Sequence, residues 1–475
     1  MPYTEFYCDA STGSNLNAGD DKPIITSTNG DWGIAAPNRF TAAFGGTPFS
    51  SVSVGDFASI YADGSTVTGY VGRVTAVNGG GASLDISSTA KSGTAPPNSA
   101  TLRSCTVGGK WKGPNGTSGF PFGFVAATMT NASSNYPRVN FKNTSNYSVT
   151  SAITHNVTGP VLFQGYTTAP GDKGKAIIDG GTTGASYALF TVSALHNFFT
   201  DFIFQNNGAT GIANGFVMSA SAAILRVVVN SVRGPGIVTT AASNNTEINE
   251  CEAYGCNQSN TSTYGGFYIA DNCWLRRCIS HDNSGSNSVG FHVQAANVIF
   301  IECIADTNGS IGFNHVSSTA RMQNCIAYNN TSDGMRANTP SVIVVNVEDS
   351  IFAKNGGYGI NLVGGGRYGP IANCAFGAGT FANTSGQINL PASNAIIESG
   401  GVTLTSNISP WNDEANGNFQ LNATLGGGAA CRNAGIGAFT QTAAGYSGTI
   451  SYPSIGSTEP VSTSGSGGAS SSFIG

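Results

Sequence analysis

The sequence CIADTN at residues 303–308 returns as CIAYNN at residues 325–330, and this repeat decides the fold. Two further copies read CISHDN at residues 278–283 and SIFAKN at residues 350–355. Self-similarity at a nearly fixed interval is typical of repeat architectures, in which each unit stacks on the next.

A glycine followed by an apolar residue, nine positions after the first residue of a copy, extends the repeat. Three copies show it as Gly312-Phe313, Gly334-Met335 and Gly359-Ile360. Because the Val, Ile, Phe and Tyr of the repeat favour strands, and because insertions can bulge at corners, the variable spacing suits a coil of short strands. We therefore predict an all-β protein, a right-handed parallel β-helix with coils about 4.8 Å apart. The first positions of the eight copies are 202, 227, 251, 278, 303, 325, 350 and 374.

Two columns of the repeat have a distinctive residue type. Cysteine recurs at the first position, where a reduced thiol behaves as a small buried hydrophobe; an interior ladder is predicted, with metal ligation or disulfides as the alternatives. Asparagine recurs five residues later, and it suits left-handed corners and amide bonds between coils. A corner ladder is predicted there, with sugar binding as the alternative. The residues are Cys251, Cys278, Cys303, Cys325 and Cys374, and Asn207, Asn283, Asn308, Asn330 and Asn355.

Composition excludes several classes of protein. Charged residues make up 9% of the 475 residues, yet 40% are hydrophobic, which favours a dense β protein over a disordered one. The 20 basic against 25 acidic residues include no basic stripe, so no nucleic-acid partner is expected. No run of 18 apolar residues is present, so no membrane span is expected. No CxxC pair occurs, and neither a metal nor a cofactor is predicted.

The chain divides by texture into six segments. Alternating strands around the glycines at 79–81 predict a small antiparallel β module, inserted before the coils near the N-terminus. The predicted segments are a lead-in at 1–44, the module at 45–107, a cap with the first coils at 108–200, regular coils at 201–400, a C-terminal cap region at 401–460, and a Gly/Ser-rich tail at 461–475.

Two segments carry a family resemblance. YCDASTGSN at residues 7–15, with NAG at 17–19, resembles the opening of pectate-lyase-like β-helix proteins. NFQL at residues 418–421, followed by AACRNAG at 429–435, is similar to the closing segment of bacterial and phage β-helix proteins, which usually reads Ser-Pro-Ala-Ile-Asp-Ala-Gly. That family includes polysaccharide lyases, glycoside hydrolases, phage tailspikes and inert fibres, so the resemblance implies a fold rather than an activity.

Weak catalytic candidates gather near one predicted corner. Asp282 lies four residues after its cysteine and Asp306 three after its own, with Glu302 nearby. The resemblance implies that a lyase would need clustered carboxylates for calcium and a basic residue, for which Arg276 or Arg277 is the neighbour. The next coil offers no carboxylate, so solvated corner residues are the plainer interpretation. The five histidines share no spacing, and we expect surface or inter-coil contacts from His155, His196, His281, His292 and His315.

The functional prediction is a structural or adhesive virion protein of a bacteriophage: a tail fibre, a spike or a capsid decoration. Met1 is followed by neither a basic n-region nor an apolar h-region, so no secretory signal peptide is expected. We expect instead that the protein leaves its cell as part of an assembled particle. The expected partners are other virion or filament subunits, including copies of itself, and a host surface glycan. The alternatives are a polysaccharide lyase or glycoside hydrolase, and a filament-forming cell-surface adhesin.

Overall fold

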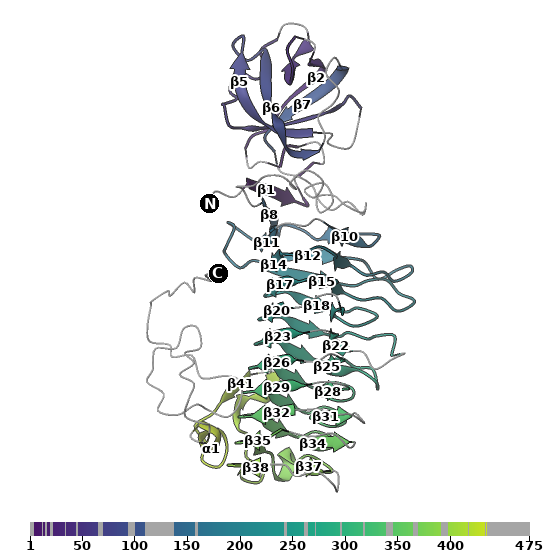
Figure 1. Ribbon diagram of the computed structural model, residues 1–475, viewed down its shortest axis with the longest axis vertical. Coiled ribbons are helices and arrows are strands. Elements are labelled where there is room, and N and C mark those ends of the chain that lie inside the picture. The colour runs from purple at the N-terminus through teal and green to yellow at the C-terminus, as the bar shows by residue number, and fades with distance from the viewer. Residues whose placement is uncertain are drawn as a thin grey trace. The chain divides into compact units, whose positions relative to one another are not determined.

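Figure 1 shows the strands of the computed structural model, coloured along the chain. The chain is made of two compact units, Met1–Val228 and Val229–Gly475. The predicted tail at 461–475 and most of the segment at 108–136 lie outside the described residues. The structure describes residues 4–434 apart from 12, 15–16, 20–21, 34, 44–45, 65–69, 94–99, 110–136, 157–159, 242–244, 261–264, 271, 295–296, 317–318, 339–344, 364–368, 391–397, 417 and 433.

The first unit contains a closed antiparallel β-barrel around a core that includes Trp32, Phe40 and Tyr70. The barrel begins at Ile25, so the predicted boundary at residue 45 is too late. Its first strand reads ITSTNGDW and buries little except near its end, which explains why this polar stretch resembles a loop in the sequence. In barrel order, the strands are β2 (Ile25–Trp32), β3 (Arg39–Thr41), β6 (Ser83–Gly93), β5 (Tyr70–Asn78), β4 (Phe57–Ala62) and β7 (Ala100–Val107).

The first unit also contains coils of parallel strands in three sheets. Their interior is aromatic: Phe163 stacks on Phe199 at 4.6 Å, and Phe190 stacks on Phe216 at 5.5 Å between centroids. The sheets are β1 (Thr4–Asp9), β8 (Pro137–Lys142), β11 (Leu162–Tyr166), β14 (Asn197–Thr200) and β17 (Ala222–Leu225); β10 (Ile153–His155), β13 (Phe190–Val192) and β16 (Phe216–Met218); and β9 (Tyr147–Ser148), β12 (Ala176–Asp179) and β15 (Phe202–Gln205).

The second unit continues this plan with three parallel sheets, after β18 (Val228–Asn230) at the unit boundary. The β20–β38 sheet is β20 (Thr246–Asn249), β23 (Cys273–Arg276), β26 (Val298–Ile301), β29 (Ala320–Gln323), β32 (Val345–Glu348), β35 (Ile371–Ala372) and β38 (Glu398–Ser399). The β19–β37 sheet is β19 (Ile237–Thr239), β22 (Gly265–Ile269), β25 (Val289–Val293), β28 (Phe313–His315), β31 (Met335–Asn338), β34 (Tyr358–Val363) and β37 (Gly386–Asn389). The β21–β39 sheet is β21 (Glu252–Tyr254), β24 (Ile279–His281), β27 (Ile304–Asp306), β30 (Ile326–Tyr328), β33 (Ile351–Ala353), β36 (Ala375–Phe376) and β39 (Val402–Thr403).

The register of these strands reproduces the sequence repeat. Ile304 pairs with Ile326, and Ile326 pairs with Ile351, each one residue after the first position of its copy. Equivalent residues of successive copies therefore stack directly on one another. The predicted parallel β-helix, with a small antiparallel module near the N-terminus, is confirmed.

The five first-position cysteines are buried and their thiols are free. The Sγ atom of Cys303 donates to the carbonyl oxygen of Leu275, on the neighbouring coil, at 3.5 Å. Burial raises the pKa of the Cys303 thiol well above its usual value. A protonated thiol of this kind is a poor nucleophile and a poor metal ligand.

The asparagine column is a chain of amide hydrogen bonds inside the coils. The Nδ2 of Asn308 donates to Oδ1 of Asn330 at 2.9 Å, and Nδ2 of Asn330 donates to Oδ1 of Asn355 at 2.9 Å. Asn383 continues the column at one end, because it accepts from Asn355 at 2.8 Å. Asn207, in the first unit, donates instead to the carbonyl of Ala213 within its own coil, at 2.8 Å.

The left-handed conformation at this corner belongs to the residue before each asparagine, not to the asparagine as the sequence suggested. Asp282, Thr307, Asn329 and Lys354 have φ values between 49° and 59°. The asparagine is thereby turned inward, where its amide can reach the neighbouring coils. Gly312, further along the coil, allows the backbones of two neighbouring coils to approach closely. A Cβ at this position would lie 2.5 Å from the carbonyl oxygen of Gly334.

The described part of the predicted C-terminal cap region lies against the side of the second unit. Trp411, Phe419 and Leu421 share one apolar cluster with Ile326 and other outward residues of the β21–β39 sheet. The residues of this sheet that point outward beneath the hairpin include Ile304, Ile326 and Ile351. The hairpin shields these apolar side chains from water, which a polar outer face would not require. The elements are η2 (Gly379–Phe381), β40 (Trp411–Asp413), η3 (Glu414–Asn416), β41 (Asn418–Leu421) and α1 (Gly428–Arg432), with β40 and β41 paired as a hairpin.

Candidate functional site

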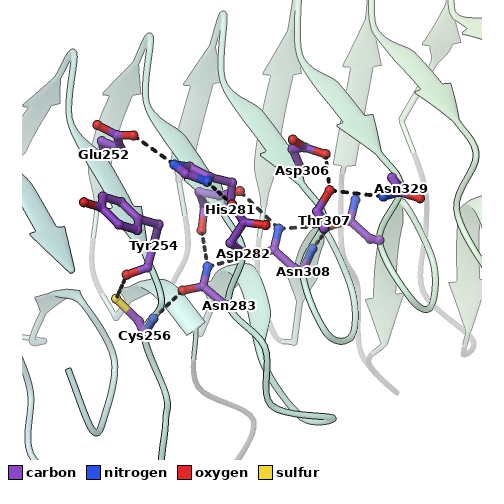
Figure 2. A network of polar contacts seen from close by, with 12 residues as sticks. Glu252, Tyr254, Cys256, His281, Asp282, Asn283, Asp306, Thr307, Asn308 and Asn329 are labelled. Atoms are coloured by element: carbon purple, nitrogen blue, oxygen red, sulfur yellow. Dashed lines mark hydrogen bonds and ion pairs between the residues drawn. The ribbon is translucent and has the colours of Figure 1, made fainter. Parts of the chain in front are cut away.

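A cluster of charged and aromatic side chains occupies the outer face of the β21–β39 sheet (Figure 2). Side chains alternate along each short strand, so that Ser280 and Ala305 point inward while His281 and Asp306 point outward. Register then places Tyr254 beside His281, and His281 beside Asp306. We call Glu252, Tyr254, His281, Asp282 and Asp306 the acidic–histidine cluster.

His281 is held at both ring nitrogens. Its Nε2 lies 2.8 Å from Oε1 of Glu252, and its Nδ1 lies 2.8 Å from Oδ2 of Asp282. Its ring stacks on that of Tyr254, with 5.0 Å between centroids and 18° between planes. Burial disfavours the charged imidazolium, but the hydrogen bonds to the two carboxylates outweigh it and raise the pKa of His281. Only the protonated ring can donate to both carboxylates at once.

Asp306 is the more deeply buried carboxyl of the cluster. The hydroxyl of Thr307 donates to its Oδ1 at 2.7 Å and accepts from Nδ2 of Asn329 at 3.1 Å. Burial raises the pKa of Asp306 to about 6; the Thr307 hydroxyl opposes this shift and the charge of Asp282 adds to it. Asp282 is exposed, with 64% of its side chain accessible. The cluster therefore combines a buried acid whose pKa is raised to about 6 with a solvent-facing carboxyl.

The structure separates Glu302 from the two aspartates. Glu302 lies at the other corner, before Cys303, with φ 55° and a side chain only 9% exposed. The Nε of Arg277 lies 2.6 Å from Oε2 of Glu302, and a guanidinium nitrogen of Arg277 lies 3.6 Å from Glu250. Glu302 and Arg277 thus form an inter-coil ion pair, away from the acidic–histidine cluster.

Sequence reasoning paired Asp282 with Asp306 but missed the other members of the cluster. The available signal was a common offset: Tyr254, His281, Asp306 and Tyr328 each lie three residues after the first position of their copy. Asp282 lies one residue further and belongs to the adjoining corner column. Within the described ranges, no three His, Cys, Asp or Glu side chains are grouped so as to hold a metal ion.

A second set of polar side chains runs along the outer face of the β19–β37 sheet, one from each strand from β22 to β37, in direct register. The ring of His292 stacks on that of Tyr268 at 5.3 Å, and its Nδ1 lies 3.1 Å from Nδ2 of Asn314. Burial lowers the pKa of His292 to about 4, so its ring is neutral at pH 7. We call this set the polar stripe. It consists of Tyr268, His292, Asn314, Arg336, Asn361 and Asn389.

The stripe is anchored by one buried carboxylate. Asp333 accepts a hydrogen bond from Nε of Arg336 at 2.7 Å and another from Nδ2 of Asn361 at 2.9 Å. The backbone N–H of Tyr358 also donates to it, at 2.8 Å. His315 follows Asn314 but points inward and is buried, so His292 and His315 face opposite sides of the same sheet.

Comparison with known proteins agrees with this architecture. The family model described as a right handed beta helix region matches residues 214–376. No curated protein matches the sequence significantly. No helix in the described part of the chain is both long and apolar enough to cross a membrane.

Similar solved structures include the pectate lyase Pel9A, at 18% identity and TM-score 0.47, covering 69% of this chain and 89% of that one. The A-module of the Azotobacter vinelandii mannuronan C-5 epimerase AlgE4 has 14% identity and TM-score 0.43, covering 57% and 83%. ORF18 of Geobacillus virus E2 has 16% identity and TM-score 0.38, covering 58% and 54%. The stacked register of the three sheets shows that the chain folds as a parallel β-helix, and its residues 214–376 match the right-handed family model.

Proposed function

We propose that this chain is a structural and adhesive protein of a virus particle, and that it contacts a surface glycan through the polar stripe. The observation that carries the proposal is the stripe itself, in which each strand of the sheet from β22 to β37 contributes one polar or aromatic side chain in direct register with the next. A periodic row of this kind suits a polymer whose units also repeat.

The chemistry of the stripe supports a saccharide ligand. Tyr268 provides a partly exposed aromatic ring, and the partly exposed Arg336 provides a forked donor that matches hydroxyl and carboxylate groups. Asn314 and Asn361 are buried, and their hydrogen bonds to His292 and Asp333 hold the stripe in place. Arg336 is one-third exposed and is fixed by its ion pair with Asp333. A side chain held in this way loses little further freedom when a ligand binds.

The stripe is also poor in groups for catalysis. Its carboxylate, Asp333, is buried and already accepts three hydrogen bonds, and burial keeps His292 neutral. These features support binding without turnover. They also support a stiff scaffold, since the ligand-facing groups bond to the coils beside them.

The test is binding of the full chain to a panel of neutral and acidic bacterial surface polysaccharides, with electron microscopy of particles to locate the subunit. We expect Arg336→Ala to weaken binding at least tenfold, whereas Val363→Ser, an exposed residue of the same sheet, leaves it unchanged. Binding that survives Arg336→Ala and Tyr268→Ala together would contradict the role of the stripe.

A polysaccharide lyase or glycoside hydrolase is the second candidate, favoured by the acidic–histidine cluster. Asp306, with its pKa near 6, is suited to donate or accept a proton at neutral pH, and Asp282 is a second carboxyl beside it. Release of unsaturated or reducing sugar ends that Asp306→Asn abolishes, with circular dichroism unchanged, would favour this candidate over the binding protein.

A further inference from the structure

The outer face of the β20–β38 sheet carries the most exposed aromatic side chain described in the second unit. Trp274 is 58% exposed. Register places Trp274 between Glu247 on one side and Ile299 on the other, and Arg321 follows Ile299. Two positions further along the same strands, Asn249, Arg276, Ile301 and Gln323 form a parallel column. We call these eight residues the Trp274 face.

Charge is arranged asymmetrically along this face. The first column runs from an acid, Glu247, through the apolar pair Trp274 and Ile299 to a base, Arg321. Glu247 is exposed and makes no ion pair with any described residue. Arg321 is 43% exposed and holds Glu348 at 3.0 Å on its far side.

We propose that the Trp274 face binds a second copy of this chain, with the two solenoids antiparallel. A two-fold axis lying along the strand direction reverses the order of the coils and keeps the columns aligned. It therefore sets Glu247 against the partner copy's arginine at position 321, twice, and sets Trp274 against the isoleucine at position 299, twice. This isologous contact satisfies both charges with the same surface patch.

The second column agrees with this arrangement. The same operation sets the amide of Asn249 against that of Gln323, and the alkyl stem of Arg276 against Ile301. Packed sheets of two copies would lie about 10 Å apart, close enough for these side chains to meet. No pair of like charges is opposed within the eight residues.

The size of the face sets the strength of the association. Three coil steps of about 4.8 Å separate Glu247 from Arg321, so the face spans about 14 Å along the axis. A stable interface buries roughly 800 Å² on each partner, more than a face of this length supplies. We therefore expect a dimer with a dissociation constant in the micromolar range, which avidity within a particle would strengthen.

The first test is sedimentation equilibrium of the full chain across micromolar concentrations. We expect a monomer–dimer equilibrium that Trp274→Ser weakens by about 30-fold, the factor typical of a central aromatic anchor. The matched control, Val363→Ser, alters an exposed apolar residue of a different sheet and is expected to leave the equilibrium unchanged. A chain that stays monomeric throughout, or a dimer indifferent to Trp274→Ser, would overturn the proposal.

A charge exchange then tests the orientation. In the first column, Glu247→Arg leaves arginine at both charged positions and Arg321→Glu leaves glutamate at both, so neither variant should dimerise alone. Mixed together, they should form a one-to-one heterodimer, because every contact again joins opposite charges. Circular dichroism checks that Arg321→Glu, which also loses the Glu348 pair, remains folded. Homodimers of either variant, or no heterodimer on mixing the two folded variants, would reject the antiparallel arrangement.

Discussion

The ring of Trp411 meets the ring of Tyr328 edge to face, with 4.9 Å between their centroids and 74° between their planes. Phe419 meets the same tryptophan at 5.3 Å. Through this contact the C-terminal hairpin belongs to an apolar core on the outside of the coils, separate from the core within them. The outward isoleucines of the β21–β39 sheet are covered by their own chain.

Loss of this tryptophan should expose that outer core. We expect Trp411→Ala to lower the free energy of unfolding of the C-terminal segment by about 3–5 kcal/mol, because a fully buried aromatic side chain is removed. Hydrogen exchange of the β40–β41 hairpin measures the effect locally. Leu425→Ala is the control in the same segment: that side chain is exposed, and a change of no more than about 0.5 kcal/mol is expected.

The acidic–histidine cluster should stabilise the fold most strongly in acid. Because the folded pKa of His281 is raised, its contribution is complete below the unfolded value of about 6.5 and is lost as the pH rises through the folded pKa. The melting temperature of His281→Asn should therefore fall furthest below that of the unmodified chain at pH 5.5, and least at pH 9.

Glu252→Gln supplies the direct check on the cause, since it removes one of the two carboxylates while keeping its shape. Titration of the His281 ring by NMR should show a lower pKa in this variant than in the unmodified chain. An unchanged pKa of the His281 ring would show that Glu252 does not stabilise its protonated form.

Asp306 should also make the protein less stable as the pH rises, but it does so because its ionised form is disfavoured by burial. A carboxyl whose folded pKa is about 6, against 3.8 ordinarily, binds its proton more tightly when folded, so stability falls as the pH rises between these values. Asp306→Asn should therefore stabilise the protein at pH 8, by at most about 3 kcal/mol, and change little at pH 3.5. Chemical denaturation at the two pH values measures the difference, and equal effects at both would refute it.

The asparagine column should be sensitive to the loss of one member. Asn330 donates to Asn355 and to the carbonyl of Ala305, and it accepts from Asn308. Asn330→Ala leaves these buried groups unpaired, at an expected cost of about 2–4 kcal/mol in the free energy of unfolding. Asn338→Ala, at the exposed end of β31, is the control and should cost little. Similar losses in both variants would mean that the column adds nothing specific.

The fold could be predicted because its signal is periodic. One residue of a copy, such as Cys303, determines where Ile304 and Asn308 must stack on their equivalents in the next copy, and register errors would turn apolar residues outward. The barrel boundary could not be predicted in this way, since β2 is a polar strand that buries few side chains.

The candidate site was predictable only in part. Asp282 and Asp306 could be predicted as candidates from their residue type, because both are acids near one corner. The stacking of Tyr254 on His281 depends instead on their shared position in the repeat, which their residue types do not reveal. The cover provided by Trp411 was beyond the repeat altogether. Which side of a solenoid a following segment packs against depends on tertiary contacts, and no period in the sequence reports it.

The hairpin against the side of the coils also has a mechanical consequence. Hydrogen bonds between parallel strands run across the strands, so tension along the axis of the second unit loads them one coil after another, as in a zipper. The hairpin shares its apolar cluster with residues of successive coils from Ile304 to Ala375. The hairpin therefore couples these coils mechanically. Under an axial pull they resist as one unit, and they separate only after the hairpin has detached from them.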